Sequence, residues 1–379
     1  MKIGVVTFWT SNDNYGQQLQ LYALQKYLRL AGHDAFLIHY DTEVVKKNPT
    51  YIRMLKALNP VKVYQYLNAR KHKRNVASEQ AAHPRYFEAF RKKYIHFSQQ
   101  FYQSFQELQV NPPDADCYIV GSDQMWNLGE GNVDIKRKHD QIHSKFLDFG
   151  KPNTLRCSYA ASWSVKSISS ELTEEIRPLL KRFDYISVRE EAGIRLCAQC
   201  GRKDAEWVAD PTLLLEPDTY RELYKAENIE TPDKPYLFLY MLNNGYTFPL
   251  DAAYQWAENH GMDVVFVAGN GTVTRRKQAY LTVPEWIGYV DHAAAVLTNS
   301  FHCAVFATQF QKPFGVVPLV GQNAGMNSRM ESLFKFCNLD RRYIRTPDDL
   351  GWMEKKVNPE IQFDRHHFLD VLERLQKKK

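Results

Sequence analysis

Two successive series of apolar strands alternating with helices constrain the fold of this chain more than any other feature. The first series opens with the segments 2–8 and 34–40, "KIGVVTF" and "DAFLIHY", which flank the helical pattern "GQQLQLYALQKYLRLAGH". Apolar residues recur at helical spacing in that pattern, and Gly32 ends it. Strand, helix and strand at this length are typical of a βαβ unit in a parallel sheet. The rhythm resumes at "DCYIVGSD" and continues to "AEWVADPTLLL".

A polar, proline-containing stretch, "EPDTYRELYKAENIETPDKP", separates this series from a second one with the strands "YLFLYML", "DVVFVAG", "AAVLTN" and "FGVVPL". Such a stretch between apolar strands is a candidate domain boundary. The length of 379 residues also favours two domains. We therefore predict two Rossmann-like, doubly wound α/β domains that face a cleft, residues 1–225 and 226–345. Residues 346–379 are predicted to be helical and to pack back on the first domain.

A polar and basic stretch over residues 45–105, containing "NARKHKRN", interrupts the first series. We interpret it as a solvated helical insertion in the first domain, and contact with a polyanion or a membrane surface is the alternative. The net charge of +6, from 49 basic and 43 acidic residues, is too small to indicate nucleic acid. It is compatible with an anionic small substrate or a polyanionic polymer.

The sequence offers no signal for export or membrane insertion. No segment reaches the ~18 apolar residues of a membrane span, and the N-terminus resembles a buried first strand rather than a secretion signal. We therefore expect a cytoplasmic protein, with peripheral association at the inner face of the membrane left open. The six cysteines should then be reduced. "CAQC", Cys197 to Cys200, lacks a second such pair and lies late in a predicted helix, so two ordinary thiols are favoured.

Several common functional motifs are missing from the sequence. There is no G-x-G-x-x-G, P-loop, H-E-x-x-H or G-x-S-x-G, so a dinucleotide, nucleotide triphosphate, metal or serine-hydrolase site is not predicted. Because ligands of doubly wound sheets bind at the carboxyl ends of strands, the candidate segments are the polar ones that follow strands. These are "NDNYG", "GSDQMW", "SVRE" and "TNSFH", together with "NSRMES" at a helix start.

These segments indicate anion chemistry. Arg189 and Arg329 each stand at the end of an element, and an arginine fork binds a carboxylate or phosphate bidentately. The helix after Asn299 presents free N–H groups and a positive dipole end. His302 would stand beside a bound anion as a proton donor. The structural alternatives are a surface pairing of Arg189 with the adjacent glutamates, a surface position for Arg329 and a purely structural His302.

The ordered set of segments resembles the polysaccharide pyruvyl transferase family over most of the chain. The set is "KIGVVTF…NYGQQLQLYALQKYL", "DCYIVGSDQMWN", "SYAAS", "ISVREEAG", "ADPTLLL", "LTNSFHCAVFATQFQKPF" and "NSRMESL". Each segment alone is a weak indication of the family, and their occurrence in this order makes the set specific for it. The resemblance implies a GT-B-like pair of domains. It also implies transfer of the pyruvyl unit of phosphoenolpyruvate to a sugar, as a pyruvate ketal on two hydroxyls, in exopolysaccharide biosynthesis.

The resemblance also implies roles for individual residues. Arg189, Ser300 and Phe301 would contact phosphoenolpyruvate, and His302 would be the general acid. Phosphoenolpyruvate is a co-substrate, so no cofactor and no metal are implied. Related members carry an arginine at the position of Ser300, so a further anion contact is expected from Arg329.

Two more positions depart from the family pattern. Many members carry an aspartate and a glycine where this chain has Asn299 and Cys303.

The acceptor is expected to be a sugar or a lipid-linked oligosaccharide. Aromatic faces and the carboxylates or amides that bind hydroxyl groups suit such a ligand. The first domain offers Asn14, Tyr15, Gly16, Asp123, Gln124 and Trp126. In the alternative interpretation of "GSDQMWN", Asp123 caps the next element and Trp126 belongs to the core.

Two other functions are compatible with the same fold. A nucleotide-sugar glycosyltransferase would be expected to bind a ribose with a carboxylate near the strand ends of the second domain. No clear candidate follows "DVVFVAG" or "AAVLTN". A non-catalytic carbohydrate-binding relative is the third interpretation, and the departures at Asn299, Ser300 and Cys303 support it.

Overall fold

The computed structural model describes residues 1–41, 81–128, 135–242, 246–269 and 274–379. The strands of the first half are β1 (Lys2–Val6), β2 (Asp34–Tyr40), β3 (Phe97–Tyr102), β4 (Cys117–Val120), β5 (Leu155–Ser158), β6 (Ser187–Val188) and β7 (Glu206–Trp207). Its helices are α1 (Tyr15–Leu30), α4 (Phe87–Tyr94), α5 (Phe105–Val110), α6 (Ile135–Lys145), α7 (Ser170–Leu180), α8 (Glu191–Gln199), the 3-10 helix η1 (Pro211–Leu213) and α9 (Pro217–Lys225).

The second half repeats the alternation of strand and helix. Its strands are β8 (Tyr236–Tyr240), β9 (Asp263–Val267), β10 (Ala295–Thr298) and β11 (Phe314–Val316). Its helices are α10 (Leu250–Asn259), α11 (Val283–His292), α12 (Phe301–Gln309), α13 (Ser328–Phe336) and the 3-10 helices η2 (Gly321–Asn327) and η3 (Pro347–Glu354), and α14 (His367–Lys378) ends the chain.

The first sheet is parallel, with the strand order β3-β2-β1-β4-β5. Helices cover both of its faces. Ile3 and Val5 of β1 point into a core that includes α1, whereas Val6 points into a second core with α6 and α7. Strands buried on both faces are near-continuous apolar runs, as "CYIV" of β4 illustrates. The short parallel pair β6–β7 continues this half beyond β5.

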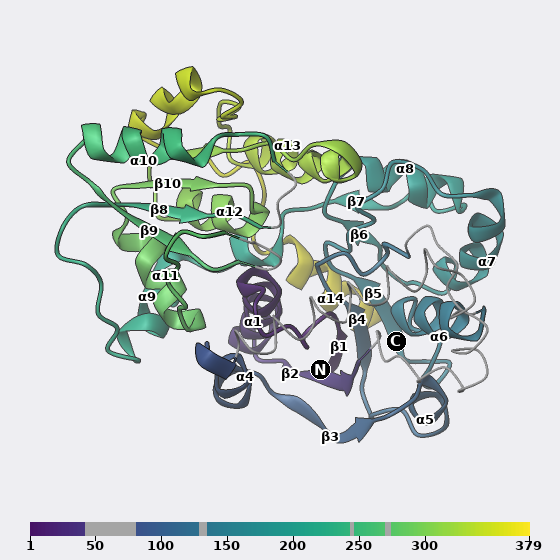
Figure 1. Ribbon diagram of the computed structural model, residues 1–379. Coiled ribbons are helices and arrows are strands. Elements are labelled where there is room, and N and C mark those ends of the chain that lie inside the picture. Colours follow the sequence, from purple (N-terminus) through teal and green to yellow (C-terminus); the bar gives the residue numbers. More distant parts are fainter. Residues whose placement is uncertain (42–80, 129–134, 243–245, 270–273) are drawn as a thin grey trace, which may run out of the picture.

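The second sheet is also parallel, with the order β11-β10-β8-β9. Phe238 and Val296 lie on the face that packs against α11 and α12. Leu239 and Leu297 lie on the opposite face, against α10 and η3. The two sheets are therefore separate, and each is sandwiched between helices (Figure 1).

Helix α1 lies between the two halves (Figure 1), and 12 of its 16 residues are buried. Tyr15, its first residue, stacks on Trp286 of α11, with ring centroids 5.4 Å apart and an interplanar angle of 14°. The Tyr15 hydroxyl donates a hydrogen bond of 2.7 Å to the carbonyl oxygen of Leu281. One apolar core consequently runs from the first sheet through α1 into the second.

The expected insertion over residues 45–105 needs correction. "NARKHKRN" and the rest of residues 42–80 lie outside the described residues. The remainder is not an insertion, because β3 pairs with β2 and forms the edge of the first sheet. Three consecutive residues of β3 are exposed, Gln99 to Phe101, as suits an edge strand. The polar and basic composition of residues 45–105 made the segment resemble a solvated insertion.

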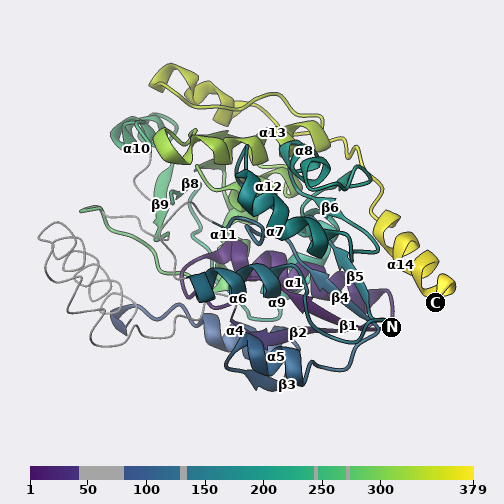
Figure 2. The same ribbon diagram turned by 90° about the vertical axis from the view of Figure 1, so that its right-hand side faces the viewer.

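The C-terminal segment packs on both halves. The 3-10 helix η3 packs against β10, β11 and α10, so residues 347–354 belong with the second sheet and not, as expected, with the first. Helix α14 lies on the first half, where the Phe368 ring is 4.7 Å from that of Tyr159. The two termini lie on the same side of the molecule (Figure 2).

The six cysteines are all free and buried. Burial raises the pKa of the Cys197 thiol to about 12 and that of Cys200 to about 11. Thiols of such high pKa are poor nucleophiles and poor metal ligands, which favours the interpretation of "CAQC" as two ordinary thiols.

Within the described ranges, no helix is both long enough and apolar enough to cross a membrane.

Candidate functional site

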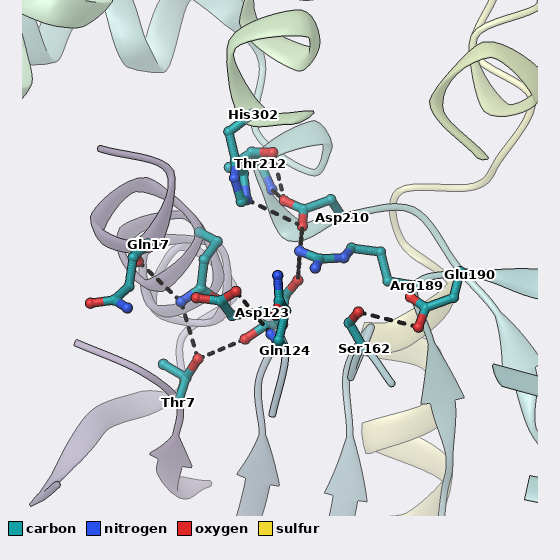
Figure 3. A network of polar contacts seen from close by, with 12 residues as sticks. Thr7, Gln17, Asp123, Gln124, Ser162, Arg189, Glu190, Asp210, Thr212 and His302 are labelled. Carbon is teal, nitrogen blue, oxygen red and sulfur yellow. Dashed lines mark hydrogen bonds and ion pairs between the residues drawn. The ribbon is translucent and has the colours of Figure 1, made fainter. Parts of the chain in front are cut away.

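The strand order of each sheet identifies a position at which a ligand is expected. The order reverses between β1 and β4 in the first sheet and between β8 and β10 in the second. In open α/β sheets, ligands bind at the carboxyl ends of strands at such a reversal. Thr7 follows β1, and its hydroxyl donates to the carbonyl oxygen of Ser122, which follows β4, over 2.7 Å. His302 follows β10, and Figure 3 shows the polar network that brings its side chain to residues of the first half.

Arg189, directly after β6, is the buried cation of this network and is 1% exposed. Its Nη1 donates to Ser122 Oγ (3.1 Å) and to Asp210 Oδ2 (2.9 Å). Its Nε and Nη2 are buried and have no hydrogen-bond partner among the described residues. Since unsatisfied guanidinium N–H groups are costly to bury, these two atoms indicate a site for an anionic ligand.

The alternative that Arg189 pairs with the adjacent glutamates at the surface is wrong. The Glu190 carboxylate accepts hydrogen bonds from the backbone N–H groups of Trp163 (2.7 Å) and Ser164 (2.9 Å). Glu191 forms an ion pair with Lys335 instead. Glu190 therefore fixes the loop after β5, and Glu191 pairs with Lys335 rather than with Arg189.

Asp210 holds the network together, and the sequence did not reveal it. Its Oδ1 accepts hydrogen bonds from the backbone N–H (3.0 Å) and the hydroxyl (2.7 Å) of Thr212, and its Oδ2 accepts one from Ser122 Oγ (2.8 Å). Burial alone would raise the pKa of Asp210, but His302 and Arg189 lower it well below its usual range. Asp210 is therefore an anion beside both groups.

A signal for Asp210 was present in "ADPT". An aspartate before a proline is a common helix-cap pattern, and Asp210 does cap η1. The pattern therefore indicated a helix cap. It did not indicate that Asp210 also forms an ion pair with Arg189.

His302 lies in the first turn of α12 and is 7% exposed. Its Nε2 is 3.7 Å from Asp210 Oδ2 and has no hydrogen-bond partner in the described part of the chain. At the other end of the ring, Nδ1 lies against Gly16 of α1. Ser300 caps the helix, with its Oγ accepting from the Cys303 N–H over 3.4 Å. An imidazole beside a fixed carboxylate is suited to carry and donate a proton.

Arg329, at the start of α13, contributes a second buried cation from the other half. Its guanidinium carbon lies 5.8 Å from the Phe301 ring centroid, and that of Arg189 lies 5.2 Å from the same ring. Burial, followed by the charge of Arg189, lowers the pKa of Arg329 to about 10. Arg329 is thus no surface residue, and the proximity of two cations favours a bound anion.

Asp123 and Gln124 also join this network. Asp123 follows β4 with φ of 87°, a left-handed conformation that is unusual for a residue other than glycine. Its Oδ1 accepts from the Gln124 N–H over 2.8 Å. Backbone strain of this kind is concentrated at functional sites, and Asp123 lies close enough to Arg329 to favour its charged form.

Two residues expected to contact the acceptor, Trp126 and Tyr15, belong to the core instead, and a third, Asn14, has a structural role as a helix cap. Trp126 is 1% exposed, donates from Nε1 to the Lys145 carbonyl oxygen over 3.2 Å and stacks on Phe146. Tyr15 is 0% exposed and lies in the core shared by the two halves. Asn14 caps α1, where its Oδ1 accepts from the Gln17 N–H over 3.1 Å. The first two side chains are enclosed by protein and present no face to a sugar.

The structure thus brings together the predicted anion-site residues Arg189, Phe301, His302 and Arg329 with the predicted acceptor residues Gly16, Asp123 and Gln124, and it adds others. Ser300, also predicted to contact the anion, caps α12. The predicted residues around the network are Gly16, Asp123, Gln124, Arg189, Phe301, His302 and Arg329. The added residues are Thr7, Ser122, Glu190, Asp210 and Thr212. Among the described residues, no cluster of three or more His, Cys, Asp or Glu side chains could hold a metal ion.

Two parallel Rossmann-like sheets, with a polar network at the carboxyl ends of their strands, are typical of a GT-B fold. UDP-GlcNAc 2-epimerase from Neisseria meningitidis has a TM-score of 0.51 at 10% identity, with complete coverage of both chains. The epimerase from Methanocaldococcus jannaschii has a TM-score of 0.50 at 12% identity, covering 99% of this chain and 100% of that one. A Listeria monocytogenes protein assigned to the same enzyme reaches 0.55 at 9% identity, covering 100% and 97%. At these identities the likeness establishes the fold alone.

The chain belongs to the polysaccharide pyruvyl transferase family, whose family model matches residues 14–318. The match includes Arg189, Asp210 and His302, whereas Arg329 lies beyond it. No curated protein matches the sequence significantly.

Proposed function

We propose that the protein transfers the pyruvyl unit of phosphoenolpyruvate onto two hydroxyl groups of a sugar, forming a pyruvate ketal in polysaccharide biosynthesis. One observation carries the proposal. Two buried guanidinium groups, Arg189 and Arg329, come from opposite halves of the molecule and face the same phenyl ring, one residue from His302. Phosphoenolpyruvate carries a phosphate and a carboxylate, and each suits a guanidinium partner.

The two arginines would divide the anionic groups between them. The free Nε and Nη2 of Arg189 form one edge of a guanidinium, the geometry that binds two oxygens of one anionic group. Arg329 compensates for the arginine that related members carry at the position of Ser300. The positive end of α12 adds to the attraction.

His302 would then start the chemistry. Its imidazolium donates a proton to the terminal methylene carbon, which becomes a methyl group and leaves an oxocarbenium-like centre. One sugar hydroxyl adds to that centre, the C–O bond to phosphate breaks, and the second hydroxyl completes the ketal. Of the two hydroxyl protons, one restores His302 and the other leaves with phosphate. The Asp210 carboxylate stabilises the imidazolium, and a positioned acid contributes typically 10²–10⁴-fold to the rate.

The acceptor would approach from the first half. Asp123 and Gln124 follow β4 at the reversal of strand order and offer a carboxylate and an amide to hydroxyl groups. We propose a sugar or a lipid-linked oligosaccharide as the acceptor. A lipid-linked acceptor would bring the protein to the inner face of the membrane.

Incubation with phosphoenolpyruvate and a panel of acceptor sugars, followed by phosphate release and by NMR of the ketal methyl group, tests the proposal. We expect phosphate to be released only when a suitable acceptor is present. A parallel incubation with UDP-GlcNAc tests the glycosyltransferase alternative. Release of UDP without any reaction of phosphoenolpyruvate would contradict the proposal.

The first prediction concerns His302→Asn. Asparagine retains hydrogen-bonding capacity but cannot donate a proton at neutral pH, so we expect kcat to fall about 10²–10⁴-fold. Phosphoenolpyruvate binding, measured by calorimetry, should be largely retained. His260→Asn, at the exposed residue that follows α10, is the matched control and should behave as wild type. Normal turnover of His302→Asn would mean that another group is the acid.

A further inference from the structure

Both ends of the His302 ring lie against residues of the first half of the chain, although α12 belongs to the second. At one end, Nε2 lies 3.7 Å from Asp210 Oδ2. At the other end, a Cβ placed on Gly16 would lie 2.2 Å from Nδ1 and 2.5 Å from Cγ. Real Cβ atoms essentially never approach a heavy atom closer than 3.0 Å, so any larger residue at this position would displace the ring.

The backbone itself does not require glycine at this position. Gly16 is the second residue of α1 and has a helical conformation that any residue adopts. Glycine costs about 1 kcal/mol relative to alanine in a helix interior. Space for His302 is therefore the physical reason for this residue. Gly288 and Gly315 also allow close contacts, but their neighbours are the apolar side chains of Ile229 and Ile344.

We propose that Gly16 is a positioning residue for His302. The bare backbone of α1 limits the ring at its Nδ1 end, and the Asp210 carboxylate attracts its Nε2 end. Together they set the direction in which the imidazolium presents its proton. This inference rests on the proposed role of His302 as the acid. It adds that the acid is aligned only when the two halves are packed together.

The test is Gly16→Ala, with Gly351→Ala as the matched control, because a Cβ on Gly351 meets no atom within 4 Å. Misplacement of a reacting group by about 1 Å can cost 10²-fold in rate. We expect a loss of about that size in kcat for Gly16→Ala, with little change in phosphoenolpyruvate affinity. The NMR signal of the His302 ring should shift in Gly16→Ala and remain in place in Gly351→Ala.

A double variant separates positioning from a general loss of structure. If Gly16 acts through His302, then Gly16→Ala combined with His302→Asn is no slower than His302→Asn alone. If the two substitutions instead reduce kcat by independent factors that multiply in the double variant, the proposal is wrong.

The melting temperature tests the proposal without any measurement of turnover. Replacing His302 by alanine removes the ring that a Cβ at position 16 would strike. The melting temperature of Gly16→Ala should therefore recover when His302→Ala is added. If it falls further, or if the His302 signal does not move in Gly16→Ala, the inference is wrong. These two measurements report the contact between Gly16 and the ring and do not depend on turnover. Absence of any reaction of phosphoenolpyruvate in the wild type would refute the proposed function and leave them unchanged.

Discussion

At the scale of single residues, Arg329 is a cation that the folded protein stabilises poorly. Burial and the neighbouring Arg189 lower its pKa to about 10, from an ordinary value of 12.5. A cation whose pKa falls on folding costs stability at every pH at which it stays charged. The cost at neutral pH is on the order of 3 kcal/mol. A bound anion would offset this loss of stability.

Arg329→Met should consequently have opposite effects with and without ligand. Without an anion, we expect the variant to melt a few degrees above wild type, because the cost of burying the charge and the repulsion with Arg189 are both gone. With phosphoenolpyruvate, wild type should gain stability through binding, whereas the variant should bind more weakly by about 2–5 kcal/mol. Thermal melts with and without the ligand measure both effects. Arg341→Met, at a largely exposed arginine, is the control and should change neither. A variant that is less stable without ligand would show that Arg329 is mainly a structural residue.

Sequence alone could place the ionisable residues but not the orientation of the aromatic ones. Arg189 and His302 were predictable because each follows a strand, and carboxyl ends of strands converge in this fold. Tyr15 and Trp126 occupy similar positions, yet both rings turn into the core. Whether a side chain after a strand faces the crevice or the core depends on the packing of both halves. A linear pattern does not contain that information.

At the scale of elements, the order of strands and helices was predictable, whereas the bounds of the short strands and the solvated edge strand were not. The segment 34–40 was predicted as a strand and forms β2 over the same residues. β6 and β7 have only two residues each, so their position depends on neighbouring strands rather than on their own sequence. The edge strand β3 was missed because a solvated edge has little apolar signal.

Helix α14 allows a prediction at this scale. Phe368 packs against Tyr159 and Tyr185, which belong to the first half and are not site residues. Phe368→Ala should reduce the free energy of unfolding by about 3–5 kcal/mol, while kcat per folded molecule stays unchanged. Denaturant titration measures the first quantity, and the phosphate-release assay measures the second. The exposed Gln376, changed to alanine, is the control. A loss of kcat in a folded Phe368→Ala protein would indicate that α14 supports the site.

At the scale of the whole molecule, the core that runs through α1 makes the two sheets interdependent. We expect a single cooperative unfolding transition despite the two-sheet architecture. In calorimetry, the measured enthalpy should equal the van't Hoff enthalpy. Because Trp286 stacks on Tyr15 across the halves, Trp286→Ala should lower the midpoint of the entire transition. Two resolved transitions in the unmodified protein would contradict this expectation.

The position of α1 has a consequence for how such chains can evolve. Recombination between related genes often exchanges whole halves of a protein at the linker between them. In this chain, the residues before the linker include a helix whose buried surface is shared with the residues after it. A chimera that inherits α1 from one parent and α11 and α12 from another would have to match two independently diverged surfaces. The heritable unit for a functional exchange is therefore the second half together with residues 15–30, although these segments lie almost two hundred residues apart.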